Sequence, residues 1–425
     1  MNDISNLLKM YRWLKDLFPI CRSITRDGQV ETLRYLKRIN KNLKIINFRT
    51  NKKVFDWKIP KVWNIEDAYI ESLKTKKKYA HFKKNNLHVV NYSEPVNKIL
   101  KTSELLKKIH THKNPNYIPY RTTYYNKNWG FCMSKKELSK LKEKTYRAVI
   151  KSNFSVGYMK LGEIIHEGKS KKEIFFSTYI CHPSMANNEL SGPVVLSKIS
   201  KYLMKLKNRK YTYRLVFLPE TIGSIAYLSK NYKKMKKNII AGYNLSCVGD
   251  NRNFSLIKSK FENSISNNSL KAELNNKKNF KIYEFKDHAS DEGHYNSPGI
   301  DIPVAGFCRT KYKSYKEYHS SADNLNIVSE SSLEGSFQVF KNIIDVYETS
   351  LFPKTKILCE PFFSKRGMYP KISGKILDQY FIDRKNIFKY SDGKFNTFEI
   401  ALKLNLNLKY VLEHLKILIK YRIIE

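Results

Sequence analysis

Short apolar runs alternate with amphipathic segments from about residue 133 to residue 350. The apolar runs are typical of buried strands and predict strands at 148–158, 173–180, 213–218, 239–247, 280–284 and 304–308. Apolar positions at helical spacing predict helices at 194–207, 223–234 and 331–349. Strands that alternate with helices in this way indicate a mixed, mostly parallel sheet covered by helices. We therefore expect an α/β fold whose main domain is an α/β/α sandwich.

The pattern changes before this region. Residues 1 to about 45 have the spacing of amphipathic helices. From 54 to about 131, strand-like pieces alternate with turns rich in proline and aromatic residues, and three of the four tryptophans lie here. We expect a main domain formed by residues 1–48 and 133–352, with a small β-rich domain inserted at 49–132.

The carboxyl-terminal part has a third pattern. After a linker that begins at Pro353, residues 371–425 contain three short helical patterns and a hairpin pattern. Two of the helical patterns, at 397–404 and 408–420, are separated by a short turn, which is helix-turn-helix spacing. We expect a separate domain at 353–425.

Composition adds two constraints. The 425 residues are 41% hydrophobic and 13% aromatic, which is enough for packed cores and excludes a disordered chain. The formal net charge of +41 suits a polyanionic partner, but lysine is dispersed along the whole chain and no basic run stands against a neutral remainder. The charge therefore does not by itself define a nucleic-acid-binding protein.

The cysteines and the apolar runs bear on localisation. Six cysteines lie far apart without a CxxC pair, which is typical of reduced thiols in a cytosolic protein. The first 22 residues carry charges throughout and lack the apolar core of a signal peptide. Since no run approaches the roughly 18 apolar residues of a membrane span, we expect a cytoplasmic protein without membrane insertion.

Three residues are the strongest candidates for chemistry. His182 and Glu220 directly follow apolar runs at 174–180 and 215–218, and His319 lies in a loop of small polar residues. Side chains at the carboxyl ends of parallel strands line the crevice where open α/β sheets bind ligands. Imidazoles that hold an ion, with a carboxylate that takes a proton from water, are what a hydrolytic zinc site needs. A single histidine of this kind is more often structural, so the prediction depends on the three occurring together.

Five further residues are candidates with open alternatives. Asn188 lies just before a predicted helix, and Asp250 follows a predicted strand, where it can bind the metal or cap a turn. Asp291 and Glu292 form an acidic pair that would receive a substrate amino group, or else cap a turn. Arg309, close to the His319 loop, would bind a carboxylate or phosphate, or else lie on the surface.

The motifs around these residues resemble a known family. Segments that match the site motifs of family-28 zinc aminopeptidases surround His182, Glu220 and His319. More closely, nearly the whole chain resembles bacterial polysaccharide-biosynthesis proteins with an aminopeptidase-like domain, through segments 55–60, 181–187, 219–224, 290–292, 317–323 and 365–370. This resemblance implies an aminopeptidase-like α/β domain, a small inserted domain and a carboxyl-terminal winged-helix domain.

The chain departs from the dinuclear pattern of the aminopeptidases. Asn188 stands where the resemblance places their bridging aspartate, and Thr221 stands where it places the glutamate after the catalytic one. Ser246 stands at the position of an aspartate in a later motif. Two divalent cations a few ångströms apart repel each other and need anionic ligands. We therefore predict one zinc ion, held by His182 and His319 with Asn188 or a nearby carboxylate such as Asp250.

These observations lead to two functional hypotheses. The first is a zinc-dependent, aminopeptidase-like hydrolase that cleaves an amide bond in a peptide or small molecule, with Glu220 as general base; the resemblance links it to surface polysaccharide biosynthesis. The second is a catalytically inactive regulatory protein that binds a ligand, with a winged helix that contacts nucleic acid or another protein. The sequence leaves open whether the chain forms a homo-oligomer.

Overall fold

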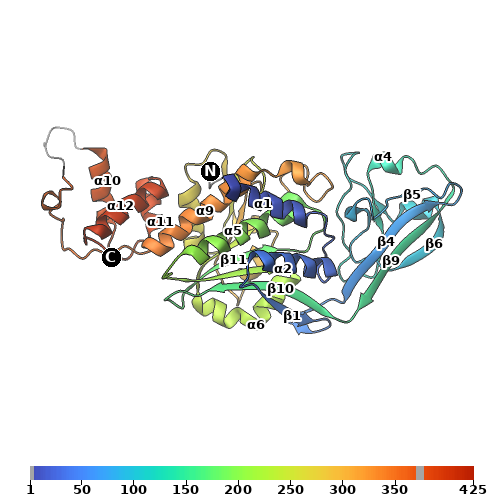
Figure 1. Cartoon of the computed structure of the whole chain (residues 1–425), viewed down its shortest axis with the longest axis horizontal. Coiled ribbons are helices and arrows are strands. Elements are labelled where there is room, and N and C mark those ends of the chain that lie inside the picture. Colours follow the sequence, from blue (N-terminus) through green and yellow to red (C-terminus); the bar gives the residue numbers. More distant parts are fainter. Residues whose placement is uncertain (1–3, 370–377) are drawn as a thin grey trace.

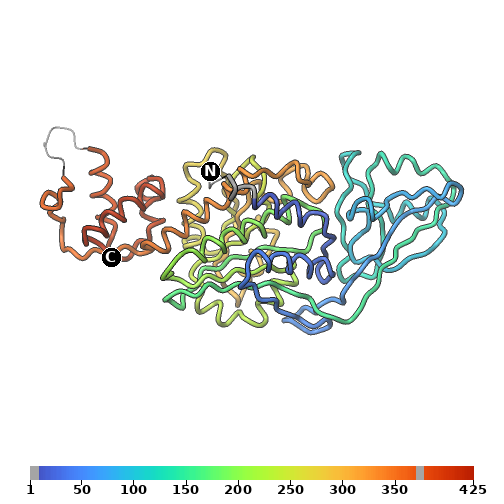
Figure 2. The backbone as a smooth tube through the Cα atoms, in the orientation of Figure 1, coloured from blue at the N-terminus to red at the C-terminus, as the bar shows by residue number. Residues whose placement is uncertain are grey.

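The computed structural model describes residues 4–369 and 378–425. The chain forms three units along the long axis of the molecule, with an α/β domain in the middle (Figures 1 and 2). A small β-rich unit lies at one end and a bundle of short helices at the other. Within the described residues, every helix is too short or too polar to cross a bilayer.

An eight-stranded mixed sheet forms the centre of the middle domain. Its order is β1-β10-β12-β11-β13-β16-β14-β15. The strands are β1 (Lys44–Arg49), β10 (Tyr158–His166), β12 (Thr212–Leu218), β11 (Glu173–Tyr179), β13 (Ile239–Leu245), β16 (Val304–Cys308), β14 (Phe254–Ile257) and β15 (Phe280–Tyr283). The four central strands β12, β11, β13 and β16 are parallel, while β10 and β14 run antiparallel to their central neighbours. The predicted mixed, mostly parallel sheet is confirmed.

Helices cover both faces of this sheet because its central strands are apolar on both sides. Ile174 and Phe176 of β11 lie in one core, and Phe175 between them lies in the other. The first core is covered by α1 (Ile4–Leu17), α2 (Asp27–Ile39), α5 (Ser191–Lys205), α7 (Ile265–Leu274) and α9 (Glu330–Thr349). The second is covered by α6 (Ile222–Asn238) and the short α8 (Glu292–Tyr295). This is the expected α/β/α sandwich.

The small unit is built on a four-stranded antiparallel sheet of order β5-β4-β9-β6. Its strands are β4 (Val62–Ser72), β5 (Lys78–Tyr79), β6 (Val96–Lys101) and β9 (Thr145–Ser155). Around it lie β7 (Ile109–His110), β8 (Phe131–Cys132), α3 (Thr102–Leu106) and α4 (Lys135–Leu138). The hairpin of β2 (Lys53–Val54) and β3 (Trp57–Lys58) packs instead against α6 of the middle domain, where Phe55 contacts Tyr232. Trp63 is fully buried in it and donates from Nε1 to the Ser93 carbonyl at 2.9 Å. Because β9 pairs with β4 and β6, this sheet extends past residue 132, where the sequence pattern alone ends the inserted domain.

The carboxyl-terminal unit contains α10 (Gln379–Lys389), α11 (Thr397–Leu404) and α12 (Leu408–Lys420). The predicted helices at 397–404 and 408–420 are confirmed to the residue. Asn405 adopts a left-handed conformation (φ +52°) at the end of α11, and the Asn407 side chain caps α12. Part of the predicted pattern, 371–377, lies outside the described residues.

Candidate active site

His182 lies at the carboxyl edge of the sheet, three residues after β11 ends at Tyr179, and is buried. Its Nδ1 lies 2.8 Å from Glu189 Oε2, and its Nε2 lies 3.7 Å from Glu220 Oε2. A carboxylate on Nδ1 fixes the ring and leaves Nε2 to face the site. Although burial opposes it, the neighbouring Cys181 and Glu189 hold the pKa of His182 well above its ordinary value. The site therefore favours positive charge at this position.

Glu189 is brought to His182 by an unusual turn. It lies in a single π-helical turn, Ala186–Leu190, that leads directly into α5. Asp323 holds this turn by accepting hydrogen bonds from the backbone N–H groups of Asn187 (2.6 Å) and Asn188 (3.0 Å). Such turns occur frequently at functional sites because they redirect side chains out of the helical register.

A buried arginine completes the back of the site. Arg22 is fully buried between α1 and α2, and its Nε donates to the His182 carbonyl at 2.9 Å. The same Nε lies 4.0 Å from Oε1 of the buried Glu189. Sequence reasoning did not single out Arg22, Glu189 or Asp323 as site residues. The one local signal was a glutamate directly after the candidate ligand Asn188.

The backbone after Glu220 is strained. The N–H of Ile222 donates to the Glu220 carbonyl at 2.9 Å across Thr221, which has φ +64° and ψ −82°. This is a γ-turn of the rare strained kind, unfavourable for a residue with a side chain. Asp291 Oδ1 stabilises it by accepting from the Thr221 N–H at 2.7 Å. The turn ends β12, starts α6 and holds Glu220 at the strand end.

The Glu220 carboxylate has one oxygen held and one facing His182. Ser290 Oγ donates to Glu220 Oε1 at 2.7 Å. The Glu220 side chain is 18% exposed, at a cavity of about 210 Å³ that is otherwise lined by Ile24, Trp57, Tyr124, Tyr125, Thr221 and Ile222. Burial raises the pKa of Glu220, while His182 and Ser290 oppose the rise. A carboxylate with a raised pKa that opens on a cavity is suited to proton transfer.

His319 faces His182 from the loop after β16. The two imidazole centres are 5.2 Å apart, and Tyr318 stacks on His319 at 3.9 Å. Tyr120, from the small unit, packs its ring edge-on against His319 at 5.2 Å. His319 Nε2 is buried without a hydrogen-bond partner in the described chain. Burial, reinforced by His182, holds the pKa of His319 well below its ordinary value, so the ring is neutral and can donate a lone pair.

Asn188 offers a second unpaired ligand atom. Its Nδ2 donates to the Tyr179 hydroxyl at 2.7 Å, which fixes the amide. Its Oδ1 is buried and, among the described residues, has no donor. Unpaired buried polar atoms are costly, so an orphaned amide oxygen and an orphaned imidazole nitrogen in one site indicate a ligand that satisfies them.

Two of the predicted residues belong to other networks. Asp250 accepts from Asn187 Nδ2 at 3.1 Å and from both the backbone N–H (3.1 Å) and Oγ1 (2.7 Å) of Thr310. These hydrogen bonds correspond to the structural role that the sequence left open for Asp250 beside metal ligation. Arg309 lies with its guanidinium carbon 3.9 Å from the centre of the Phe254 ring, and its Nε donates to a backbone carbonyl at 2.8 Å. It is fixed there rather than presented to a substrate carboxylate or phosphate.

The acidic pair is buried rather than presented to a substrate amine. Asp291 is fully buried and bonded to Thr221, and burial together with Glu220 holds the pKa of Asp291 well above its ordinary value. Glu292 is also fully buried and accepts from Asn244 Nδ2 at 2.7 Å and from the Tyr312 hydroxyl. Both carboxylates are hydrogen-bonded within the protein near Glu220, and a contact with a substrate amino group stays a prediction.

Potential metal ligands lie on both sides of the His182 ring. Among the described residues, one group of three potential ligands has its donor atoms within 4.8 Å of one another, namely Cys181, His182 and Glu189. This group surrounds Nδ1 of His182 and lies beside the Arg22 guanidinium, which disfavours a second positive charge there. The orphaned His319 Nε2 is not part of it.

The Nε2 side of the His182 ring faces other candidate donor atoms. Glu220 Oε2 lies there, and His319, whose Nε2 is unpaired, flanks the same ring. Asn188, whose Oδ1 is unpaired, is bonded to Tyr179, which also contacts this ring. Thr221 and Ser246 are neutral, so the acidic ligands of a second ion are missing. The residues offer nitrogen and neutral oxygen donors to an ion.

The fold and this His–Glu–His site define an aminopeptidase-like α/β protein with a carboxyl-terminal winged-helix domain. The chain belongs to the family described as "Domain of unknown function (DUF4910)", whose model matches residues 11–350. A winged helix-turn-helix model matches residues 351–425.

Individual relatives agree with this assignment. The chain is 39% identical over 405 residues to a Clostridium acetobutylicum protein that is named, provisionally, a polysaccharide biosynthesis protein with an aminopeptidase-like domain; the match covers 93% of this chain and 91% of that one. A crystal structure of a provisionally named peptidase from the same organism has a TM-score of 0.90 at 35% identity, covering 99% and 96% of the two chains. A zinc aminopeptidase from Bacillus subtilis has a TM-score of 0.60 at 14% identity, covering 80% and 94%, which shows a shared fold. The family and the aminopeptidase-like fold are confirmed.

Proposed function

We propose that this protein is a metal-dependent hydrolase of amide bonds in which Glu220 acts as general base. The observation that carries the proposal is the position of Glu220. Its Oε2 faces His182 Nε2 at 3.7 Å, beyond hydrogen-bonding distance, at the mouth of an apolar cavity. An oxygen without a hydrogen bond to the imidazole is left to accept a proton.

The proposed ion is zinc, which His182 Nε2, His319 Nε2 and Asn188 Oδ1 would hold. When bound, zinc lowers the pKa of a coordinated water towards roughly 7 and polarises a carbonyl group. Glu189 keeps the His182 ring in orientation, and Ser290 holds one oxygen of Glu220 in place. Glu220 then takes a proton from the attacking water and passes it to the leaving amine.

The relatives support this proposal and indicate the substrate class. The Clostridium structure carries the name of a peptidase, and the Bacillus subtilis protein is a zinc aminopeptidase. The Clostridium sequence relative is linked by name to polysaccharide biosynthesis. We therefore propose a peptide or an amide-containing glycan precursor as substrate.

Metal content and activity of matched variants test the proposal. We expect about one zinc per wild-type chain, and loss of that zinc in both His182→Ala and His319→Ala. Glu220→Gln should keep zinc and lose about 10²–10⁴-fold in kcat on an aminoacyl-amide panel, because only the base is removed. A wild-type protein without zinc after reconstitution, or a fully active Glu220→Gln variant, would refute it.

A second function is favoured by the surface of α12. Four of its exposed residues, Lys409, Glu413, Lys416 and Lys420, recur at helical spacing, and three of them are basic. This is the helix that follows the turn of the helix-turn-helix, the position that enters the major groove in DNA-binding proteins. We propose salt-dependent binding of duplex DNA, weakened by Lys409→Ala/Lys416→Ala. Absence of binding at low salt would exclude it.

A further inference from the structure

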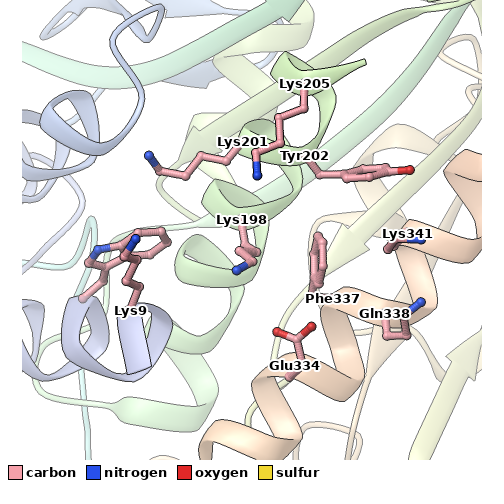
Figure 3. Close-up of a pocket in the computed structure, with 10 residues that line it drawn as sticks. Lys9, Lys198, Lys201, Tyr202, Lys205, Glu334, Phe337, Gln338 and Lys341 are labelled. Atoms are coloured by element: carbon pink, nitrogen blue, oxygen red, sulfur yellow. The ribbon is translucent and has the colours of Figure 1, made fainter. Parts of the chain in front are cut away.

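A second cavity lies away from the candidate active site, between α1, α5 and α9. Its volume is about 660 Å³. It is lined by Lys9, Trp13, Lys198, Lys201, Tyr202, Lys205, Glu334, Phe337, Gln338 and Lys341. Figure 3 shows Lys198, Lys201 and Lys205 along one helix, with Lys9 on a second helix and Glu334, Gln338 and Lys341 on a third. None of these residues contributes to the His182 site.

The lining is strongly basic. Five lysines face one carboxylate, that of Glu334. Lys341 is neutralised by Asp345 at 2.9 Å, but Lys9, Lys201 and Lys205 form no ion pair with any carboxylate of the described residues. Positive charges gathered in a concave site focus the field and attract an anion. The spacing of lysines along α5 places them on one face of the helix, so they act on the same volume.

Aromatic rings interleave with these ammonium groups. Lys201 Nζ lies 5.9 Å from the centre of the Trp13 ring, and Lys198 Nζ lies 5.6 Å from that of Phe337. Trp13 is only partly buried, so it offers ring surface to the cavity. Planar rings next to cationic groups suit a ligand that has both a flat aromatic part and negative charge.

We propose that this cavity binds a nucleoside polyphosphate. Lysine ammonium groups act as point charges on phosphate, and the indole supplies a stacking surface for a base. The volume lies within the roughly 300–1,000 Å³ range of small-molecule sites, and inorganic phosphate alone would leave the aromatic wall uncovered. The proposal is independent of the hydrolase activity.

Calorimetric titration with ATP, without divalent cations, tests the charge component. Lys201→Ala/Lys205→Ala is the test variant, and Lys171→Ala/Lys172→Ala is the control because it removes the same charge from an exposed loop. We expect saturable binding to the wild-type protein with a Kd below about 1 mM, weakened about tenfold or more in the test variant and less than about twofold in the control. Equal weakening in both variants would show that dispersed charge, rather than the cavity, binds ATP, and would overturn the proposal.

Comparison of probes tests the aromatic component. Trp13→Leu should weaken ATP binding while leaving tripolyphosphate binding unchanged, and adenosine alone should bind poorly. Thermal unfolding of each variant checks that the fold is kept. Tripolyphosphate that binds as tightly as ATP, with no effect of Trp13→Leu, would exclude a nucleoside. Tighter binding of a single-stranded oligonucleotide than of ATP would identify a nucleic-acid surface instead.

Discussion

Glu189→Gln tests how the buried charge network supports the site. The carboxylate of Glu189 contacts His182 Nδ1 at 2.8 Å and lies 4.0 Å from Arg22 Nε. Glutamine has nearly the same shape and can still accept from Nδ1 through its amide oxygen. Glutamine cannot neutralise Arg22, so the substitution measures the effect of removing the negative charge alone.

The two distances set the size of the effect. At 4.0 Å and an effective dielectric constant of about 20, the Arg22–Glu189 attraction is about 4 kcal/mol before desolvation. Arg22 keeps hydrogen bonds to the carbonyls of His182 (2.9 Å) and Leu17 (2.8 Å), which offset part of the loss. We therefore expect the free energy of unfolding to fall by about 3 kcal/mol, the lower end for a broken buried pair. Zinc affinity should fall about 10–100-fold, because His182 loses a charged partner.

Denaturant unfolding of five proteins measures the change in stability. The wild type, Glu189→Gln, Arg22→Met and the double variant form a cycle, and Glu66→Gln is a control at a side chain that is 75% exposed. The double variant should be more stable than the sum of the single effects predicts by at least about 1 kcal/mol, since neither charge is left alone. Additive effects, or a Glu189→Gln variant as stable as Glu66→Gln, would refute the coupling. Competition with a chelator measures the change in zinc affinity.

Three further predictions use other parts of the molecule. His414, fully buried between Tyr380 and Tyr410 with both ring nitrogens unpaired in the described chain, has its pKa lowered to about 4 by burial and then by a nearby arginine. Folding therefore favours the neutral ring, so the free energy of unfolding of the wild type should fall by up to about 3 kcal/mol as the pH falls from about 6.5 to 4. Urea unfolding at both pH values should show a smaller decrease for His414→Phe. Thr221→Gly should raise the free energy of unfolding by about 1 kcal/mol because it relieves the strained φ of +64°; a variant less stable than wild type would contradict this. Trp57→Ala should raise KM for substrates with a bulky apolar group and leave kcat nearly unchanged, with a small-substrate series as control.

The hydrophobic pattern predicted the four central parallel strands, β11, β12, β13 and β16, but did not reveal β10 and β14. Every residue of β11 is buried, and its run of apolar residues marks it clearly. The pattern did not reveal α7, because this helix buries polar residues such as Ser266, Asn267 and Glu273. Their side chains are held by hydrogen bonds, for example Ser266 Oγ to the Pro303 carbonyl at 2.6 Å and Asn342 Nδ2 to Glu273 Oε1 at 2.9 Å. Because the buried residues of α7 include these polar side chains as well as Leu270 and Leu274, the sequence shows no continuous apolar stripe there.

The site residues likewise fall into those that a local pattern predicts and those that depend on distant contacts. His182 and Glu220 were predicted together because both follow central parallel strands, and the ends of such strands meet at one edge of the sheet. For Asp250 the sequence left metal binding and turn capping open, and in the structure Asp250 accepts from the N–H of Arg252 at 3.0 Å, as turn capping requires. The contact between Arg22 and His182 joins residues 160 positions apart, and no local pattern encodes it.

The placement of Glu189 bears on the number of metal ions. In the two-zinc aminopeptidases that the motifs resemble, a carboxylate bridges the ions at the position of Asn188. Here the acid stands one residue later, and the π-helical turn directs it to Nδ1 of His182, on the side away from Glu220. The carboxylate thus strengthens one ligand instead of joining two ions, and Arg22 balances its charge from behind. A second cation bound beside Asn188, Thr221 and Ser246 would find no negative charge on these three side chains to offset its repulsion from the first.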